Sequence, residues 1–356
     1  MSNPDLVAEQ DRSIRRYFEK PEDALSARVA SEPVCLYLET TNRCNLLCTT
    51  CPRTFEELEP EADMSWDLFT SIVGQFAGIK RVVLHGVGEP MLVKDLPERI
   101  EYLKRRGIYV LFNTNGTLLN EANSRRLLQA GPDELRVSLD AAESSVFQLV
   151  RGKDMFDRIV QNLTAFRHLQ RELGVERPRV SLWLTGLRET LAQLEAFIRL
   201  AHGMDVSEVY LQRLVFFEDN PNGLARPESA LFEKTTEHEA RLIAQAEAVA
   251  QELGIMFSAS GATEPTASVH RIREDQPWSL CRRPWTLMYF TATGRALPCC
   301  IAPFSMHGYD SFTLGDATQQ TLKDIWNGER YYTFRQALMG PHPPRACASC
   351  GLRWSL

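Results

Sequence analysis

The chain has 356 residues, of which 44% are hydrophobic, and a formal net charge of −6. Basic and acidic residues alternate without the basic stripe of nucleic-acid-binding proteins, and no apolar run reaches the roughly 18 residues of a membrane span. The polar residues 1–20 lack the apolar segment of a secretory signal. We therefore expect a cytoplasmic protein with no nucleic-acid or membrane partner, and one large and one small domain.

Strand-like and helix-like segments alternate after a polar leader, residues 1–33, in which we expect one short helix at 5–18. Repeated βα units predict a parallel sheet with helices outside it. Residues 34–260 are thus expected to form an α/β fold, a partial (β/α)6 TIM-like barrel. The expected strands are 34–39, 81–85, 109–113, 135–139, 179–184 and 209–214, with a short strand at 255–258. The expected helices are 66–75, 96–106, 121–130, helices within 144–173, 191–201 and 229–253.

The last part of the chain, residues 261–356, differs in character and is expected to be a small cysteine-rich domain. Residues 260–280 are polar and indicate a linker. The segments 286–291 and 295–298 flank a short turn, which favours a hairpin. Two short helices are expected at 320–327 and 330–339.

Nine cysteines occur in the chain, and their clustering argues against scattered packing roles. In a reducing compartment, cysteines in tight groups are more often metal ligands than disulfides. One group lies near the N-terminus and one near the C-terminus, with no cysteine between 51 and 281. The cysteines are Cys35, Cys44, Cys48, Cys51, Cys281, Cys299, Cys300, Cys347 and Cys350.

The first group, Cys44, Cys48 and Cys51, has the spacing C-x3-C-x2-C directly after an expected strand. Structural zinc sites usually use four ligands, and no histidine follows here within ten residues. Three thiolates on a four-iron cluster leave one iron open to a further ligand. The spacing favours such a cluster, with a structural zinc site as the alternative.

With the E-x-T-N-x-C lead-in that begins at Glu39, this segment resembles the radical S-adenosylmethionine (SAM) superfamily, and the resemblance extends from about Val34 to the C-terminus. It implies a 4Fe–4S cluster whose open iron chelates SAM. One electron then cleaves the sulfonium bond and yields a 5′-deoxyadenosyl radical. The cofactor carries the chemistry, while the protein supplies binding and orientation. An external one-electron donor such as flavodoxin or ferredoxin is implied as a partner.

Other motifs resemble the family in order along the chain, most of them at expected strand ends, where ligands bind in parallel sheets. The segment 85–90, HGVGEP, is similar to a "GGE" motif that holds the SAM amino group. Two positions depart from the family pattern: Thr50 replaces a bulky residue that packs on adenine, and His85 replaces a small residue. We expect His85 to be hydrogen-bonded to backbone at the strand end, with a role near the substrate as the alternative. The implied SAM-binding residues are Gly86, Gly88, Glu89, Asn115, Ser138, Asp140 and Arg151.

The second cysteine group resembles the SPASM extension of radical SAM enzymes, in its shortened "twitch" form because the later ligands are missing. The resemblance implies one auxiliary 4Fe–4S cluster held by Cys281, Cys299, Cys347 and Cys350. Four thiolates would leave no open iron, which indicates an electron relay. A four-cysteine zinc ribbon is the alternative.

Two cysteines remain. Cys35 lies early on the first expected strand and is expected to pack in the core. Cys300 adjoins an expected cluster ligand. It is expected to be either a core residue of the hairpin or a catalytic hydrogen-atom donor to a substrate radical.

We expect the radical to abstract a hydrogen atom from a small hydroxyl-rich metabolite, a sugar or aminocyclitol, with epimerisation through Cys300 as the first hypothesis. The short segment before Val34 is too small for a leader-binding domain, which disfavours a peptide substrate. The alternatives are a dehydrogenase that uses the auxiliary cluster, a peptide-modifying SPASM maturase, and a non-enzymatic iron–sulfur or zinc scaffold. Candidate substrate contacts are Gln212, Arg213, Glu218, Asp219 and Asn220.

Overall fold

The computed structural model describes residues 25–216, 222–231, 235–260, 264–269, 276–305 and 307–348. Several predicted features lie outside these residues: the helix at 5–18, the ligand Cys350, and the candidate contacts Glu218, Asp219 and Asn220. Among the helices of the described residues, none combines the length and the apolar character needed to cross a membrane.

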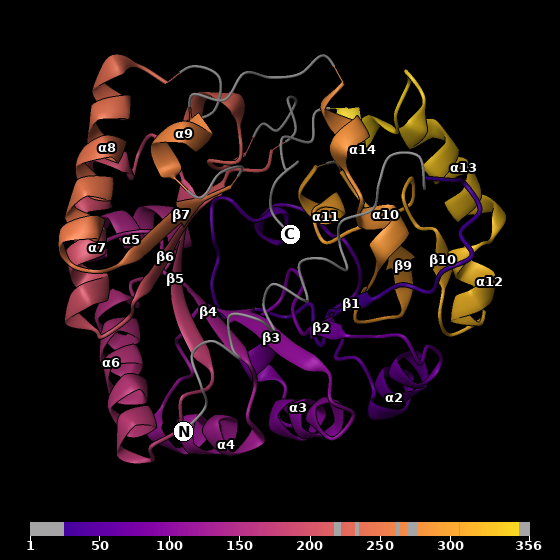
Figure 1. Ribbon diagram of the computed structural model, residues 1–356, viewed down its shortest axis with the longest axis horizontal. Coiled ribbons are helices and arrows are strands. Elements are labelled where there is room, and N and C mark those ends of the chain that lie inside the picture. Colours follow the sequence, from indigo (N-terminus) through magenta and orange to yellow (C-terminus); the bar gives the residue numbers. More distant parts are fainter. Residues whose placement is uncertain are drawn as a thin grey trace.

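A single ten-stranded sheet forms the centre of the molecule, in the order β10-β9-β8-β1-β2-β3-β4-β5-β6-β7 (Figure 1). Strands β1 to β7 pair in parallel with their sequence neighbours, and β8 pairs in parallel with the other side of β1. The strands are β1 (Cys35–Leu38), β2 (Arg81–Val83), β3 (Tyr109–Thr114), β4 (Glu134–Ser138), β5 (Arg179–Gly186), β6 (Glu208–Arg213), β7 (Met256–Ala259), β8 (Leu287–Phe290), β9 (Arg295–Leu297) and β10 (Gly315–Asp316).

Helices cover the outer side of the sheet, and the C-terminal helices lie beyond its β8–β10 edge (Figure 1). The two ends of the sheet, β7 and β10, do not pair with each other among the described residues. The fold is therefore a partial TIM-like barrel, as predicted. The helices are α2 (Trp66–Gly74), α3 (Leu96–Lys104), α4 (Glu121–Ala130), α5 (Ser144–Arg151), α6 (Phe156–Glu172), α7 (Leu194–Gly203), α8 (Glu237–Glu252), α9 (Pro265–Val269), α10 (Arg283–Thr286), α11 (Ala302–Ser305), α12 (Leu322–Trp326), α13 (Glu329–Met339) and α14 (Arg345–Ala348).

Two predicted segments were wrong in detail. The helix expected at 229–253 begins only at Glu237, because Thr236 and Glu239 form a capping box that fixes its start. The predicted linker 260–280 contains helical turns, α9 and the 3-10 helix η6 (Pro277–Leu280). Proline in the first turn suits both segments, since its missing N–H would have no partner there.

The side chains of β1 alternate between two environments, as the period of a strand requires. Leu36 and Leu38 pack in the large core between sheet and helices, whereas Cys35 and Tyr37 belong to a smaller cluster inside the barrel. The same alternation continues in β4, where Leu135 joins the outer core. The inner face is thereby free to carry polar chemistry.

The predicted hairpin is present and extends the barrel sheet. Strand β8 pairs with β1 over Cys35–Leu38 and with β9 in antiparallel register. The C-terminal cysteine region is therefore joined to the first barrel strand by backbone hydrogen bonds. The division into residues 1–33, 34–260 and 261–356 stays a prediction.

Candidate active site at the open end of the barrel

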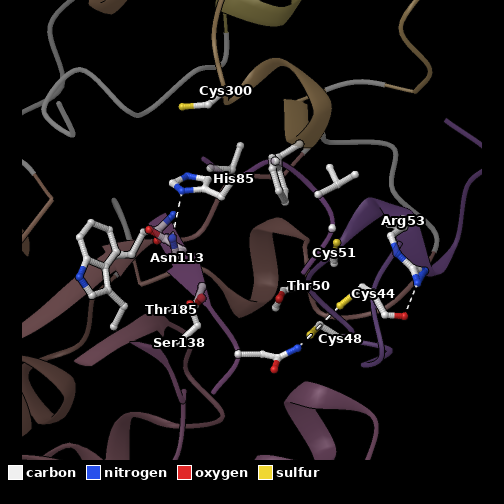
Figure 2. A pocket seen from close by; sticks show the side chains of 18 of the residues that line it. Cys44, Cys48, Thr50, Cys51, Arg53, His85, Asn113, Ser138, Thr185 and Cys300 are labelled. Carbon is white, nitrogen blue, oxygen red and sulfur yellow. Dashed lines mark hydrogen bonds between the residues drawn. The ribbon is translucent and has the colours of Figure 1, made fainter. Parts of the chain in front are cut away.

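A cavity of about 240 Å³ opens at the carboxyl ends of the strands, the edge where ligands bind in parallel sheets (Figure 2). It brings together thirteen residues predicted from the sequence: Cys44, Cys48, Cys51, Gly86, Gly88, Glu89, Asn115, Ser138, Asp140, Arg151, Cys300 and the candidate substrate contacts Gln212 and Arg213. These residues come from segments spread over most of the chain, so the barrel fold is what assembles them.

The loop after β1 carries the three cysteines and is held by hydrogen bonds to its backbone. Arg53 donates to the carbonyl of Cys44 (2.7 Å), and the Thr54 hydroxyl donates to the carbonyl of Cys48 (2.8 Å). Two nitrogen donors reach the sulfur atoms: Asn115 Nδ2 lies 3.9 Å from Cys44 Sγ, and Arg151 Nη1 lies 3.5 Å from Cys48 Sγ. Such donors stabilise negative charge on sulfur, which suits ligands of an iron–sulfur cluster.

Glu89 is buried, and its carboxylate fixes the end of β3. It accepts hydrogen bonds from the Thr114 hydroxyl (2.7 Å), the Asn115 amide (2.7 Å) and the Met91 amide (3.0 Å). Burial raises its pKa, which these donors oppose. Carboxylate oxygens offer about four acceptor sites, so the group retains capacity for a further donor such as an ammonium group.

The glycines of the 85–90 segment are required by close approaches of the chain. A Cβ at Gly88 would lie 2.1 Å from the carbonyl oxygen of Thr41, and one at Gly86 would lie 2.0 Å from a Glu39 carboxylate oxygen. No side chain fits at either distance. The glycine-rich loop is therefore packed directly against the segment that leads into the cysteines.

Glu39 is a functional candidate that the sequence did not single out beyond its place in a motif. Its buried carboxylate accepts from the Val87 amide (2.7 Å), the Tyr289 hydroxyl (2.8 Å) and the Ala292 amide (3.2 Å). Burial raises the pKa of Glu39 to about 7. The residue thus connects the glycine-rich loop to the C-terminal hairpin, a contact between distant segments that spacing alone could not reveal.

Asp140 and Arg151 form a buried ion pair (2.6 Å) at the edge of the cysteine loop. Asp140 has a positive φ and also accepts from the Thr185 amide (2.6 Å). Gly152 follows with φ +73°, and a Cβ there would lie 2.2 Å from the Leu47 carbonyl. Arg151 and Gly152 therefore position the cysteine loop.

Thr50, the departure from the family pattern, lines the cavity, and so do the apolar residues Leu214, Val215 and Phe304. Phe304 also lines a small neighbouring pocket together with Thr50. Apolar side chains of this kind can pack on an adenine ring, and the sequence prediction did not identify them.

The cavity has two walls. We call the side with the three cysteines the cysteine wall. We call the side with His85, Arg136 and Trp183 the arginine wall, and it carries hydrogen-bond donors. Arg136 Nε pairs with Glu134 (2.6 Å), and its guanidinium lies 4.4 Å from the Trp183 ring centre. His85 Nδ1 accepts from the Asn113 amide (3.1 Å; Figure 2). The sequence prediction favoured a His85 bonded to backbone, and this bond is present.

Three of the predicted auxiliary ligands lie on neighbouring elements. Cys281 follows η6, Cys347 lies in α14, and α14 contacts both η6 and α11; Cys299 directly precedes Cys300 and packs against Ala302 of α11. Buried Arg283 lies close enough to Cys281 and Cys299 to interact with their charge. The fold therefore brings the elements of these cysteines together, and their role as auxiliary ligands stays a prediction.

The two remaining cysteines have different surroundings. Cys35 is fully buried inside the barrel, and burial raises its pKa to about 12, which fits a packing residue. Cys300 lines the cavity, and its thiol receives a hydrogen bond from the Tyr37 hydroxyl. Figure 2 shows the Cys300 side chain reaching into the space beyond His85. Because Cys300 also packs against the inner cluster that contains Tyr289 and Leu297 of the hairpin, its two expected roles both stay predictions.

Comparison with known families agrees with this barrel fold. A family model of the radical SAM superfamily matches residues 38–201, and one for SPASM, an iron–sulfur cluster-binding domain, matches residues 281–351. The chain belongs to the radical SAM superfamily and has a C-terminal SPASM domain. The two domains imply a SAM-binding 4Fe–4S cluster, an auxiliary cluster and SAM as cofactors.

Several relatives match over most of the chain. The tungsten-containing aldehyde ferredoxin oxidoreductase cofactor-modifying protein of Pyrococcus furiosus is 23% identical over 89% of this chain and 87% of its own length. The PqqA peptide cyclase of Gluconobacter oxydans is 26% identical, over 89% and 83%. Streptococcus suis SuiB, solved with its precursor peptide SuiA, has the same fold with a TM-score of 0.63 and 14% identity, covering 94% of this chain and 72% of SuiB.

Proposed function

We propose that the chain is a radical SAM enzyme that modifies a peptide, with Cys44, Cys48 and Cys51 as ligands of the SAM-binding cluster. The observation that carries the proposal is the similarity to PqqA peptide cyclase over most of both chains. The fold shared with SuiB, which was solved with a precursor peptide, supports it. The peptide takes the place of the small hydroxyl-rich metabolite as first candidate, and that metabolite becomes the alternative.

We infer a separate role for each wall of the cavity. When bound, the cluster and SAM supply a 5′-deoxyadenosyl radical that abstracts a hydrogen atom. On the cysteine wall, Glu89 and the Asp140–Arg151 pair hold the strand ends and the cysteine loop in place. The arginine wall faces the remaining space, where a substrate side chain can enter. We further propose Cys281, Cys299, Cys347 and Cys350 as auxiliary ligands, and an external one-electron donor as partner.

Cys300 supports a second candidate, epimerisation. After hydrogen abstraction, a thiol on the opposite face can return its hydrogen atom to the carbon radical, which inverts the centre. The resulting thiyl then needs one electron and one proton, for which the auxiliary cluster and the external donor are the electron source. The Cys300 side chain lines the same cavity as the three cysteines, as this step requires.

The test uses reconstituted enzyme, SAM and dithionite under anaerobic conditions. One sample receives a short peptide encoded next to the gene, and another receives a panel of sugars and aminocyclitols. We expect 5′-deoxyadenosine above the uncoupled level, with a changed peptide, only in the first sample. Turnover of the sugars alone would contradict the peptide proposal.

Deuterated water separates the two outcomes on a peptide. Epimerisation through a thiol adds one solvent deuterium to the product, whereas oxidation or crosslinking removes two hydrogens. Cys300→Ala should abolish the deuterium incorporation if Cys300 is the donor. Unchanged deuterium incorporation in that variant would exclude the donor role.

A further inference from the structure

The interior of the barrel holds more positive than negative charge. Five arginine side chains share the electrostatic neighbours Cys35, His85, Tyr210 and Glu134 inside the barrel, and three of them, Arg136, Arg213 and Arg283, line the cavity. Two carboxylates compensate them: Glu134 pairs with Arg136 and Arg179, and Glu208 pairs with Arg179. The other two arginines are Arg81 and Arg179.

The acidic residues that line the cavity lie on one side of it. They are Glu89 and Asp140, which belong to the cysteine wall and are bonded to protein donors there. On the arginine wall, by contrast, Arg136 is 13% exposed and uses Nε for Glu134. Among the described residues, its two terminal nitrogens have no hydrogen-bond partner, and the Arg136 side chain lines the cavity. They can form a two-pronged contact with a carboxylate.

His85 adds a donor of fixed orientation. Its Nδ1 accepts from the Asn113 amide, and burial together with the charges of Arg136 and Arg81 lowers its pKa to about 3. A neutral imidazole that accepts at Nδ1 carries its proton on Nε2. The Nε2–H bond has no partner among the described residues, so it is available to a ligand in the cavity.

We propose that the arginine wall binds a carboxylate of the substrate, with Arg136 as the principal contact and His85 Nε2–H as a second donor. Burying these charged donors against a neutral ligand group costs free energy, because their hydrogen bonds stay unmade. An anion forms those hydrogen bonds and is therefore bound favourably. The carboxylate follows from the cavity alone. That it belongs to a peptide, as an acidic side chain or as the C-terminus, depends on the proposed function.

The test is a ligand-observed NMR titration of the reconstituted, SAM-bound enzyme, which requires no turnover. Two isomeric probes distinguish the sources: N-acetylglutamic acid α-amide presents a side-chain carboxylate, and N-acetylglutamine presents a terminal one. N-acetylglutamine amide is the neutral control. We expect one acidic probe to bind about tenfold or more tightly than the neutral probe, as charged hydrogen bonds allow.

Arg136→Gln should remove this preference, and Arg136→Lys should retain part of it because the charge remains. Arg105→Gln, an exposed arginine of the C-cap of α3, is the matched control and should change nothing. If Arg136→Gln does not fold because Glu134 loses its closest ion pair, the double variant Glu134→Gln/Arg136→Gln removes both charges. Equal binding of acidic and neutral probes, or a preference that survives loss of Arg136, would overturn the proposal.

Glutarate, a small dicarboxylate, separates this inference from the proposed function. If glutarate binds as tightly as the acidic peptide analogues and loses affinity in Arg136→Gln, the carboxylate site stands while the peptide receives no support. If only the peptide analogues show the Arg136-dependent preference, both are supported.

Discussion

The two walls of the cavity differ in how far the protein itself satisfies their polar groups. On the cysteine wall, Glu89 accepts three protein donors and Arg151 pairs with Asp140. On the arginine wall, the terminal nitrogens of Arg136 and Nε2 of His85 have no hydrogen-bond partner among the described residues. A wall whose polar groups are already hydrogen-bonded within the protein suits cofactors that are the same in every turnover. A wall with donors that lack a protein partner suits a charged substrate.

The largest effect should come from breaking the cysteine wall at a ligand. We expect Cys48→Ala to reduce 5′-deoxyadenosine formation to background, because two thiolates cannot hold the SAM-binding cluster. The measurement combines product formation with iron and sulfide content. Cys35→Ala is the matched control, since Cys35 is buried in the barrel away from the loop; it should lower stability and keep its iron. Equal iron loss in both variants would contradict the assignment.

The difference between the walls also explains what the sequence could reveal. The cysteine wall was predicted residue by residue, because its parts lie in short motifs directly after strands, such as Cys44 to Cys51. On the arginine wall, His85 was singled out but Arg136 and Trp183 were missed, because single residues from separate strands meet only when the barrel forms. A signal was present: in β4, Glu134, Arg136 and Ser138 alternate with the apolar Leu135 and Val137.

That alternation predicts a polar inner face in a sheet that is otherwise buried on both sides. Arg179, Ser181, Trp183 and Thr185 of β5 repeat it. The strand positions were predicted correctly from the same segments, but the direction of each side chain was not used. Contacts such as Glu39 with Tyr289 join segments too distant for any spacing rule.

A smaller effect should follow from displacing the glycine-rich loop of the cysteine wall. Gly88→Ala places a methyl group 2.1 Å from the Thr41 carbonyl, so the backbone must shift. We expect a loss of about 1–3 kcal/mol in the free energy of unfolding, as for other overpacked sites, and weaker SAM binding. Gly74→Ala, at the end of α2 with no atom within 4 Å, is the control and should be close to neutral. Similar losses in both variants would show that the close approach does not matter.

The smallest effect concerns protonation on the arginine wall. The pKa of His85 is about 3 in the folded protein against 6.5 as its ordinary value, because burial and Arg136 disfavour the charged ring. Below pH 6.5 the His85 imidazole is therefore protonated in the unfolded chain and neutral in the folded protein. The free energy of unfolding consequently falls as the pH falls. In His85→Asn this term is absent, while Asn can still accept from the Asn113 amide. Between pH 7.5 and 5.5 we expect the wild type to lose about 1 kcal/mol relative to this variant in denaturant unfolding. If the two proteins respond equally to pH, His85 has the same pKa in the folded and unfolded states, and at pH 5.5 the arginine wall would carry a second positive charge instead of a neutral donor.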